Sequence, residues 1–134
     1  MTHVLLPVVA LWRRRDAVAV IGAAVLAWHA GAGHRRIAAG VGVPATTVRG
    51  WLRRFGANAG FLAAQFAAVA HVLDRDLGRI EPQGSPVGDA LEAVGVAASA
   101  AARRFGATPV WSFAAGASGG RLLCNTSSPF PLLS

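Results

Sequence analysis

The sequence predicts an all-helical fold, and three observations support this prediction. Hydrophobic residues make up 54% of the chain, and small ones such as Ala and Val dominate. The alternation of large β-branched and aromatic residues that is typical of strands is missing. Gly and Pro fall between the apolar runs, where they begin and end helices. The 134 residues leave room for one ordinary domain, or for one small domain with an extension.

The N-terminal part predicts one helix after an apolar lead-in. Residues 1–12 are apolar and contain Pro7, so we expect an extended segment there. Asp16 is suited to cap a first helix, because its carboxylate accepts the unpaired N–H groups of the first turn. That helix is expected to run to about Ala30 and to end at the Gly31–Gly33 stretch.

Two short helices joined by a tight turn are predicted next. A second helix is expected from His34 to Gly40, and residues 41–43, with Gly42 in the middle, form the turn. Pro44 then opens a third helix that runs to Phe55, because the first helical position needs no N–H group.

The remaining sequence predicts a packing helix and a small C-terminal extension. Gly56 and Gly60 bracket the start of a fourth helix at about 57–77, which has apolar residues at three- and four-residue intervals. Ser85 and Pro86 begin a fifth helix that runs to about Phe105.

Gly106 ends the fifth helix, and Thr108 with Pro109 begins a short sixth one at about 110–117. Residues 118–134 are rich in Gly, Ser and Pro, and we expect a loose tail. The predicted domains are therefore 1–77, a linker at 78–86, and a helical extension at 87–134.

The charge indicates a polyanionic partner. The chain has 13 basic residues, all Arg, against 6 acids, a net charge of +7. Residues 1–73 carry eight of these Arg and one acid, Asp16, while residues 74–134 carry five of each sign. The basic function is expected in the N-terminal half.

The predicted second and third helices fit a helix-turn-helix of the homeodomain-like kind. Such a motif needs a small residue where the helices touch, a tight turn, and apolar residues that fix the second helix. Ala38 is the small residue, and Gly42 follows four positions later, where the turn asks for positive φ. The inward-facing apolar residues are Ile37, Val41, Val48, Trp51, Leu52 and Phe55. The core is thus a three-helix unit with additional C-terminal helices.

The opposite side of the third helix is small and basic, which predicts binding of double-stranded DNA. Arg can bond guanine bidentately, Thr can touch a base, and a Gly lets the helix approach the groove floor. The residues expected to contact bases are Thr46, Arg49, Gly50 and Arg53. Those expected to contact the DNA backbone are Arg35, Arg36, Thr47 and Arg54. The run Arg13–Arg15 is either a solvated stretch or a further phosphate contact.

Membrane association is the alternative. The uncharged stretch 17–30 follows three Arg and imitates a short span. Its 14 residues fall below the ~18–20 that a spanning helix needs, which favours a buried helix. A signal peptide would begin with its basic residues, whereas an apolar run comes first here.

The sequence predicts neither a metal site nor an enzyme. No two of the four His have the His-x-x-x-His spacing of a helical zinc site, and packing or capping is expected of His29 and His34. The acids Asp74 and Asp76 are interpreted as a helix-end charge cluster, and Asp89 with Glu92 as a solvated pair. Cys124 is the only cysteine, so no internal disulfide is expected and a reducing cytoplasm fits. We expect no cofactor.

The chain also resembles a family of bacterial proteins described as transposase-like or helix-turn-helix domain proteins. The matching stretches are Thr2–Pro7, Gly33–Phe55, Trp111–Phe113 and Gly119–Leu123. The resemblance implies an origin in mobile elements, where such modules recognise element ends for a recombinase. In the family a Cys-rich zinc ribbon typically precedes the Thr-His-x-Leu-Leu-Pro stretch. The sequence here starts at that stretch, so we expect the ribbon to be missing, and its zinc or DNA contacts cannot be carried over.

A strand-transfer site would need three metal-binding acids on a separate mixed α/β domain, which this chain has neither the length nor the strand pattern to form. We therefore expect an accessory DNA-binding protein or a remnant of a mobile element, cytoplasmic and associated with the nucleoid. A protein-interaction role is a third hypothesis, with a homodimer or a recombinase as partner, because one motif reads few base pairs.

Overall fold

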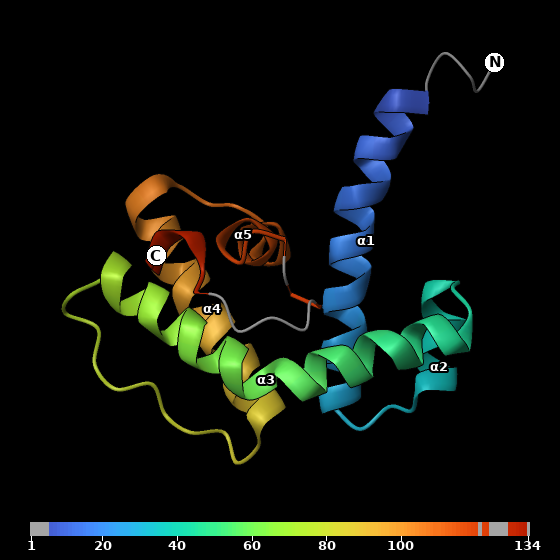
Figure 1. The fold of residues 1–134 in the computed structure, drawn as a ribbon, viewed down its shortest axis with the longest axis horizontal. Helices are drawn as coiled ribbons and strands as arrows, with labels where there is room; N and C mark the ends of the chain where they lie inside the picture. Colours follow the sequence, from blue (N-terminus) through green and yellow to red (C-terminus); the bar gives the residue numbers. More distant parts are fainter. Residues whose placement is uncertain (1–5, 121, 124–128, 134) are drawn as a thin grey trace.

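The structure is a computed structural model. It describes residues 6–120, 122–123 and 129–133, and for residues 6–17 it describes the backbone alone. Within these ranges the chain forms five α-helices, one short 3₁₀ helix and no strand (Figure 1). The all-helical prediction is therefore confirmed.

The first helix is longer than predicted. Helix α1 spans Leu6–His29, so it begins ten residues before Asp16. The expected extended lead-in is therefore wrong for residues 6–12, and so is the cap at Asp16, while residues 1–5 of the lead-in lie outside the described residues. Pro7 lies in the first turn of α1, where the missing N–H costs no helical hydrogen bond. The predicted end is confirmed, since α1 ends just before Gly31, which has a φ of 106°.

Helix α2 and the turn after it agree with the prediction. Helix α2 spans His34–Val41, one residue longer than expected. Gly42 follows it in the left-handed conformation, with a φ of 75°, and its N–H bonds the carbonyl oxygen of Ala38. A residue in the left-handed conformation ends the helix and turns the chain away from the helix axis, and Gly adopts it without steric cost.

The expected third and fourth helices are one helix. Helix α3 spans Ala45–Leu73, which is 29 residues, and no break occurs at Gly56 or Gly60. A β-carbon on Gly56 would come within 3.1 Å of the Trp28 ring, so this Gly accommodates the close approach of α1. A helical Gly costs roughly 0.5–1 kcal/mol relative to Ala. Burial of one continuous apolar face, at Val48, Leu52, Phe55, Ala59, Leu62, Phe66, Val69 and Ala70, outweighs that cost.

Helix α4 spans Pro86–Phe105, as predicted. The Ser85 hydroxyl caps it by accepting a hydrogen bond of 3.0 Å from the N–H of Gly88, and Gly106 ends it with a φ of 100°. The chain between α3 and α4 leaves the helical conformation at Asp74, four residues earlier than the expected linker. Helix α4 packs against α3 in the most extensive contact between described elements.

Helix α5 spans Val110–Ala117, and the 3₁₀ helix η1 spans Pro131–Leu133. The bounds of α5 match the prediction, but its N-cap residue is Pro109, and no side chain caps it. Figure 1 shows α5 beside α1, and η1 near the C-terminal half of α4.

The buried core is continuous from α1 to the last described residues. Its largest fully buried side chains include Phe55, Leu62, Phe66 and Phe130. The ring of Phe130 meets Phe66 edge-on at 4.9 Å, and its N–H donates to Oε1 of Gln65 at 2.9 Å. The segment expected to be a loose tail thus supplies a core residue.

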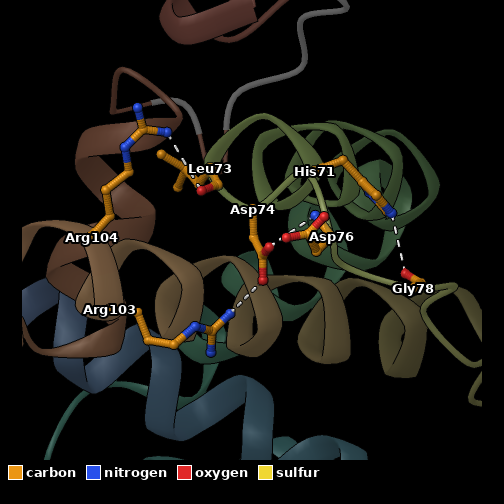
Figure 2. A network of polar contacts seen from close by, with 7 residues as sticks. All are labelled: His71, Leu73, Asp74, Asp76, Gly78, Arg103 and Arg104. Atoms are coloured by element: carbon orange, nitrogen blue, oxygen red, sulfur yellow. Dashed lines mark hydrogen bonds and ion pairs between the residues drawn. The ribbon is translucent and has the colours of Figure 1, made fainter.

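A polar network fastens the C-terminal ends of α3 and α4 to each other (Figure 2). Asp74 Oδ2 accepts from Arg103 Nη2 at 3.0 Å, and Asp74 Oδ1 accepts from the N–H of Asp76. Nη1 of Arg104 lies 3.5 Å from the carbonyl oxygen of Leu73. The charge cluster expected around Asp74 is therefore part of a bridge between two helices.

Candidate nucleic-acid interface

The α2–Gly42–α3 segment rests on a buried apolar seam. Ile37 and Ala38 are buried on α2, and Val48 and Leu52 are buried on α3. These are residues that the sequence assigns to the inner side. Because the seam and the Gly42 turn fix both helices, the opposite side of each helix is held in a defined orientation.

The outer side carries the predicted contact residues, which we call the basic face. The side chains of Arg35, Arg36, Thr46, Thr47, Arg49, Arg53 and Arg54 are all exposed, and Gly50 is half-buried among them. No acid occurs in the sequence between Asp16 and Asp74. In the part of the chain that the structure describes, none of these Arg lies within ion-pair distance of a carboxylate.

Two of these Arg come together at an open hollow of about 490 Å³. Arg49 and Arg53 of α3 line it together with His34, at the start of α2. Trp28 and residues 31–33 line it from the end of α1, and no acid is among the lining residues. The hollow thus joins the basic side of α3 to the first turn of α2.

His34 and Trp28 were not predicted to lie beside the contact residues. The sequence suggested packing or capping for His34, whereas its half-exposed side chain lines the hollow with Arg49 and Arg53. The position of His34 as the first residue of α2 was the available signal. Trp28 lies at the hollow because α1 packs beside α3, and no local sequence pattern around α3 indicates that contact.

The N-terminal end of α2 presents unpaired N–H groups next to this hollow. Gly33 is its N-cap residue and supplies no side-chain hydrogen bond. The first turn carries Arg35 and Arg36, and the Ile37 N–H makes the first helical hydrogen bond, to Gly33. Free N–H groups and the positive end of the helix dipole favour anions such as phosphate.

Arg54 lies over Gly50 on the other edge of the basic face. Its Nε donates to the Gly50 carbonyl oxygen at 3.2 Å, and a β-carbon on Gly50 would lie 3.4 Å from Nη2. This bond directs the guanidinium back along α3.

The far end of the basic face borders the tail. Leu123 lines a small hollow of about 160 Å³ with Arg53, Arg54, Ala57 and Asn58. Sequence reasoning gave no sign of this neighbour, because about 70 residues separate Leu123 from Arg54. The open part of the basic face on α3 is therefore its first three turns.

Several predicted features lie where the structure gives no side chain. Residues 2–5 of the family-like stretch, Arg121 and Cys124 lie outside the described residues, and the side chains of Arg13–Asp16 do as well. The described residues contain no group of three or more His, Cys, Asp or Glu placed to hold a metal ion.

The described helix with the length and apolar composition of a membrane span is α3, not the predicted 17–30 segment. Among the described residues α3 alone is long and apolar enough to cross a membrane, and core helices of soluble proteins pass the same test. The predicted segment appears only as the shorter apolar stretch Val18–His29.

Comparison of the chain with protein-family models, with curated proteins and with solved structures found no match.

Proposed function

We propose that this protein binds double-stranded DNA through α2 and the first three turns of α3, used as a helix-turn-helix on a homeodomain-like three-helix core. One observation carries the proposal: the exposed sides of both helices carry five Arg without an acid, beside a left-handed Gly42 turn. Phosphate repulsion is absent from this surface, and salt-sensitive attraction to DNA follows from its charge.

The dimensions of α3 suit the major groove. An α-helix with its side chains is about 10–12 Å across, which is comparable to the ~12 Å width of that groove. Thr46, Arg49, Gly50 and Arg53 then face base edges, and Gly50 leaves room for close approach. The tail at Leu123 borders only the end of this segment.

The phosphate contacts would flank the groove. Arg35 and Arg36 lie in the first turn of α2, whose N-terminal end favours anions. Thr47 and Arg54 lie on the other side of α3, and the bond from Arg54 to Gly50 holds that guanidinium along the helix edge. Phosphate contacts on both sides would fix the register of α3 in the groove.

The wider biological role rests on the family resemblance. We propose an accessory or remnant protein of a bacterial mobile element, without catalysis and without a cofactor, that acts in the cytoplasm at the nucleoid. A second copy or a recombinase would supply further base pairs of recognition. A monomeric mass in solution would count against self-pairing.

Selection from random duplexes by the purified protein tests the proposal. An enriched site of a few base pairs is expected, with binding that weakens steeply with salt. If about five Arg contact phosphate, the slope of log K against log salt is expected near −4 to −5. Binding that is absent at low salt, or that does not change with salt, would contradict DNA binding.

Cell fractionation separates DNA binding from membrane association. The protein is expected in the soluble fraction or with nucleic acid that a high-salt wash releases. Recovery only with membranes after that wash would favour the membrane alternative, in which apolar helices hold the protein.

A further inference from the structure

A second hollow lies at the opposite end of α3 from the basic face. Its volume is about 610 Å³, and its walls come from four elements: Val69 and Leu73 of α3, the C-terminal half of α4, α5, and Leu132 of η1. Small-molecule sites in proteins typically span about 300–1,000 Å³ and are concave and mostly apolar. The hollow has the size of such a site and opens to the surface.

Its lining is apolar with two hydroxyl groups. Apart from Thr108 and Ser112, every lining residue is aliphatic, aromatic, Gly or Pro, and none is charged. Phe105 at its edge is 73% exposed and Leu132 is 51% exposed. Large apolar side chains at this exposure leave surface that an apolar molecule would remove from water, which favours binding.

One cation, Arg104, does not line the hollow itself but lies against two residues that do. Nη1 of Arg104 lies 3.5 Å from the carbonyl oxygen of Leu73, and its Cζ lies 5.7 Å from the ring centre of Phe105. Leu73 and Phe105 both line the hollow. A 3.5 Å hydrogen bond is at the long end of the range, so the guanidinium is held weakly and can turn to a stronger acceptor.

The neighbouring acid does not cancel this cation. Asp74 shares a small polar hollow with Arg103 and Arg104, and its carboxylate is paired with Arg103 at 3.0 Å (Figure 2). Among the described residues Arg104 has no carboxylate partner of its own. A carboxylate placed beside Leu73 would therefore have the Arg104 guanidinium as its hydrogen-bond donor.

We propose that this hollow binds a small apolar molecule with a single carboxylate, its apolar body between α3, α4 and α5 and its carboxylate on Arg104. The uncharged walls exclude a ligand with several charges, because each would lose its hydration without a partner. The proposed DNA binding does not enter this argument, since the basic face lies at the other end of α3.

Calorimetric titration of the purified protein with decanoate tests the proposal, with decan-1-ol as the uncharged analogue. Decanoate is expected to bind, and Arg104→Gln is expected to weaken it by about tenfold or more, as a charge-assisted hydrogen bond implies. Decan-1-ol is expected to bind with the same affinity to wild type and to Arg104→Gln. Arg75→Gln, an exposed Arg of the loop after α3, serves as the matched control and is expected to leave decanoate binding unchanged.

A second variant tests the position of the site. Gly116 lines the hollow, and a β-carbon there would meet no atom within 4 Å, so Gly116→Leu is expected to place its side chain in the hollow. This variant is expected to lose binding of both ligands, while Gly95→Leu on α4, which also has open space, retains it. Circular dichroism checks that both variants are folded.

Three outcomes would overturn the proposal. The first is that wild type binds neither ligand, and the second is that a folded Gly116→Leu variant binds decanoate as wild type does. The third is that Arg104→Gln and Arg75→Gln bind decanoate alike, which removes the carboxylate contact. The Arg104 comparison decides the matter even where Gly116→Leu does not fold.

Discussion

The indole ring of Trp111 on α5 occupies the space into which a β-carbon on Gly22 of α1 would point. Three ring atoms, Cδ1, Cε2 and Nε1, lie in direct contact with that position. This contact joins the first helix to the fifth, and Gly22 itself is buried. Any side chain at Gly22 has to displace the ring.

Gly22→Ala is therefore expected to destabilise the protein by about 1–3 kcal/mol, the usual cost of overpacking a core. The gain in helix propensity from Gly to Ala, about 1 kcal/mol, works in the opposite direction. Urea unfolding measures the difference. Gly60→Ala is the control, because a β-carbon there meets no atom within 4 Å, and it is expected to be neutral or stabilising. Equal effects of the two substitutions would contradict the α1–α5 contact.

Gly42→Ala is expected to lower stability by about 1–2 kcal/mol, because Gly42 has a φ of 75° and a non-Gly residue is strained there. Gly40→Ala two residues earlier, in helical conformation with open space, is expected to stabilise by up to about 1 kcal/mol. Thermal unfolding of the pair measures both. The DNA affinity of the folded Gly42→Ala variant is expected to fall as well, since the turn sets the angle of α3. An unchanged melting temperature of Gly42→Ala would contradict a strained conformation at this turn.

Arg53→Ala is expected to change the sequence preference of DNA binding, whereas Arg35→Ala is expected to change the overall affinity. Arg53 is the proposed base contact, so its loss should cost about 1–3 kcal/mol on the selected site and relax preference at one position. Arg35 is a proposed phosphate contact, so its loss should weaken all duplexes alike and reduce the salt slope by about 1. Competition binding with matched and mismatched duplexes separates the two effects. Arg79→Ala, in the exposed loop after α3, is the control, and an equal loss for Arg79 would point to a diffuse charge effect.

Phe130→Ala is expected to cost about 3–5 kcal/mol, because its ring is 1% exposed and packs against Phe61 and Phe66. Leu132→Ala, two residues later and 51% exposed, is expected to change stability by no more than about 0.5 kcal/mol. Denaturant midpoints of the two variants make the comparison. If Phe130→Ala were as mild as Leu132→Ala, the C-terminal segment would not belong to the core.

The sequence by itself determined the helical class and most helix ends. The signals that begin and end these helices depend on residues within one or two turns, so local chemistry marks the boundaries. They are the periodic apolar residues, the pair Ser85 and Pro86, and the glycines Gly31, Gly42 and Gly106. The basic outer side of α3 follows equally from helical periodicity, since residues three and four apart share a side.

Only the tertiary structure decided the features that depend on distant partners. Gly56 predicts a helix break from the sequence alone, but in the structure Trp28 packs against it. Burial along one face of α3 then keeps the two predicted helices as one continuous helix. The sequence places Phe130 in a loose tail, whereas in the structure its ring packs against the rings of Phe61 and Phe66. His34 lines the same hollow as Arg49 and Arg53 only because of the tertiary arrangement of α2 and α3. Each of these positions is set by burial against residues far along the chain, and local propensity is too weak to report it.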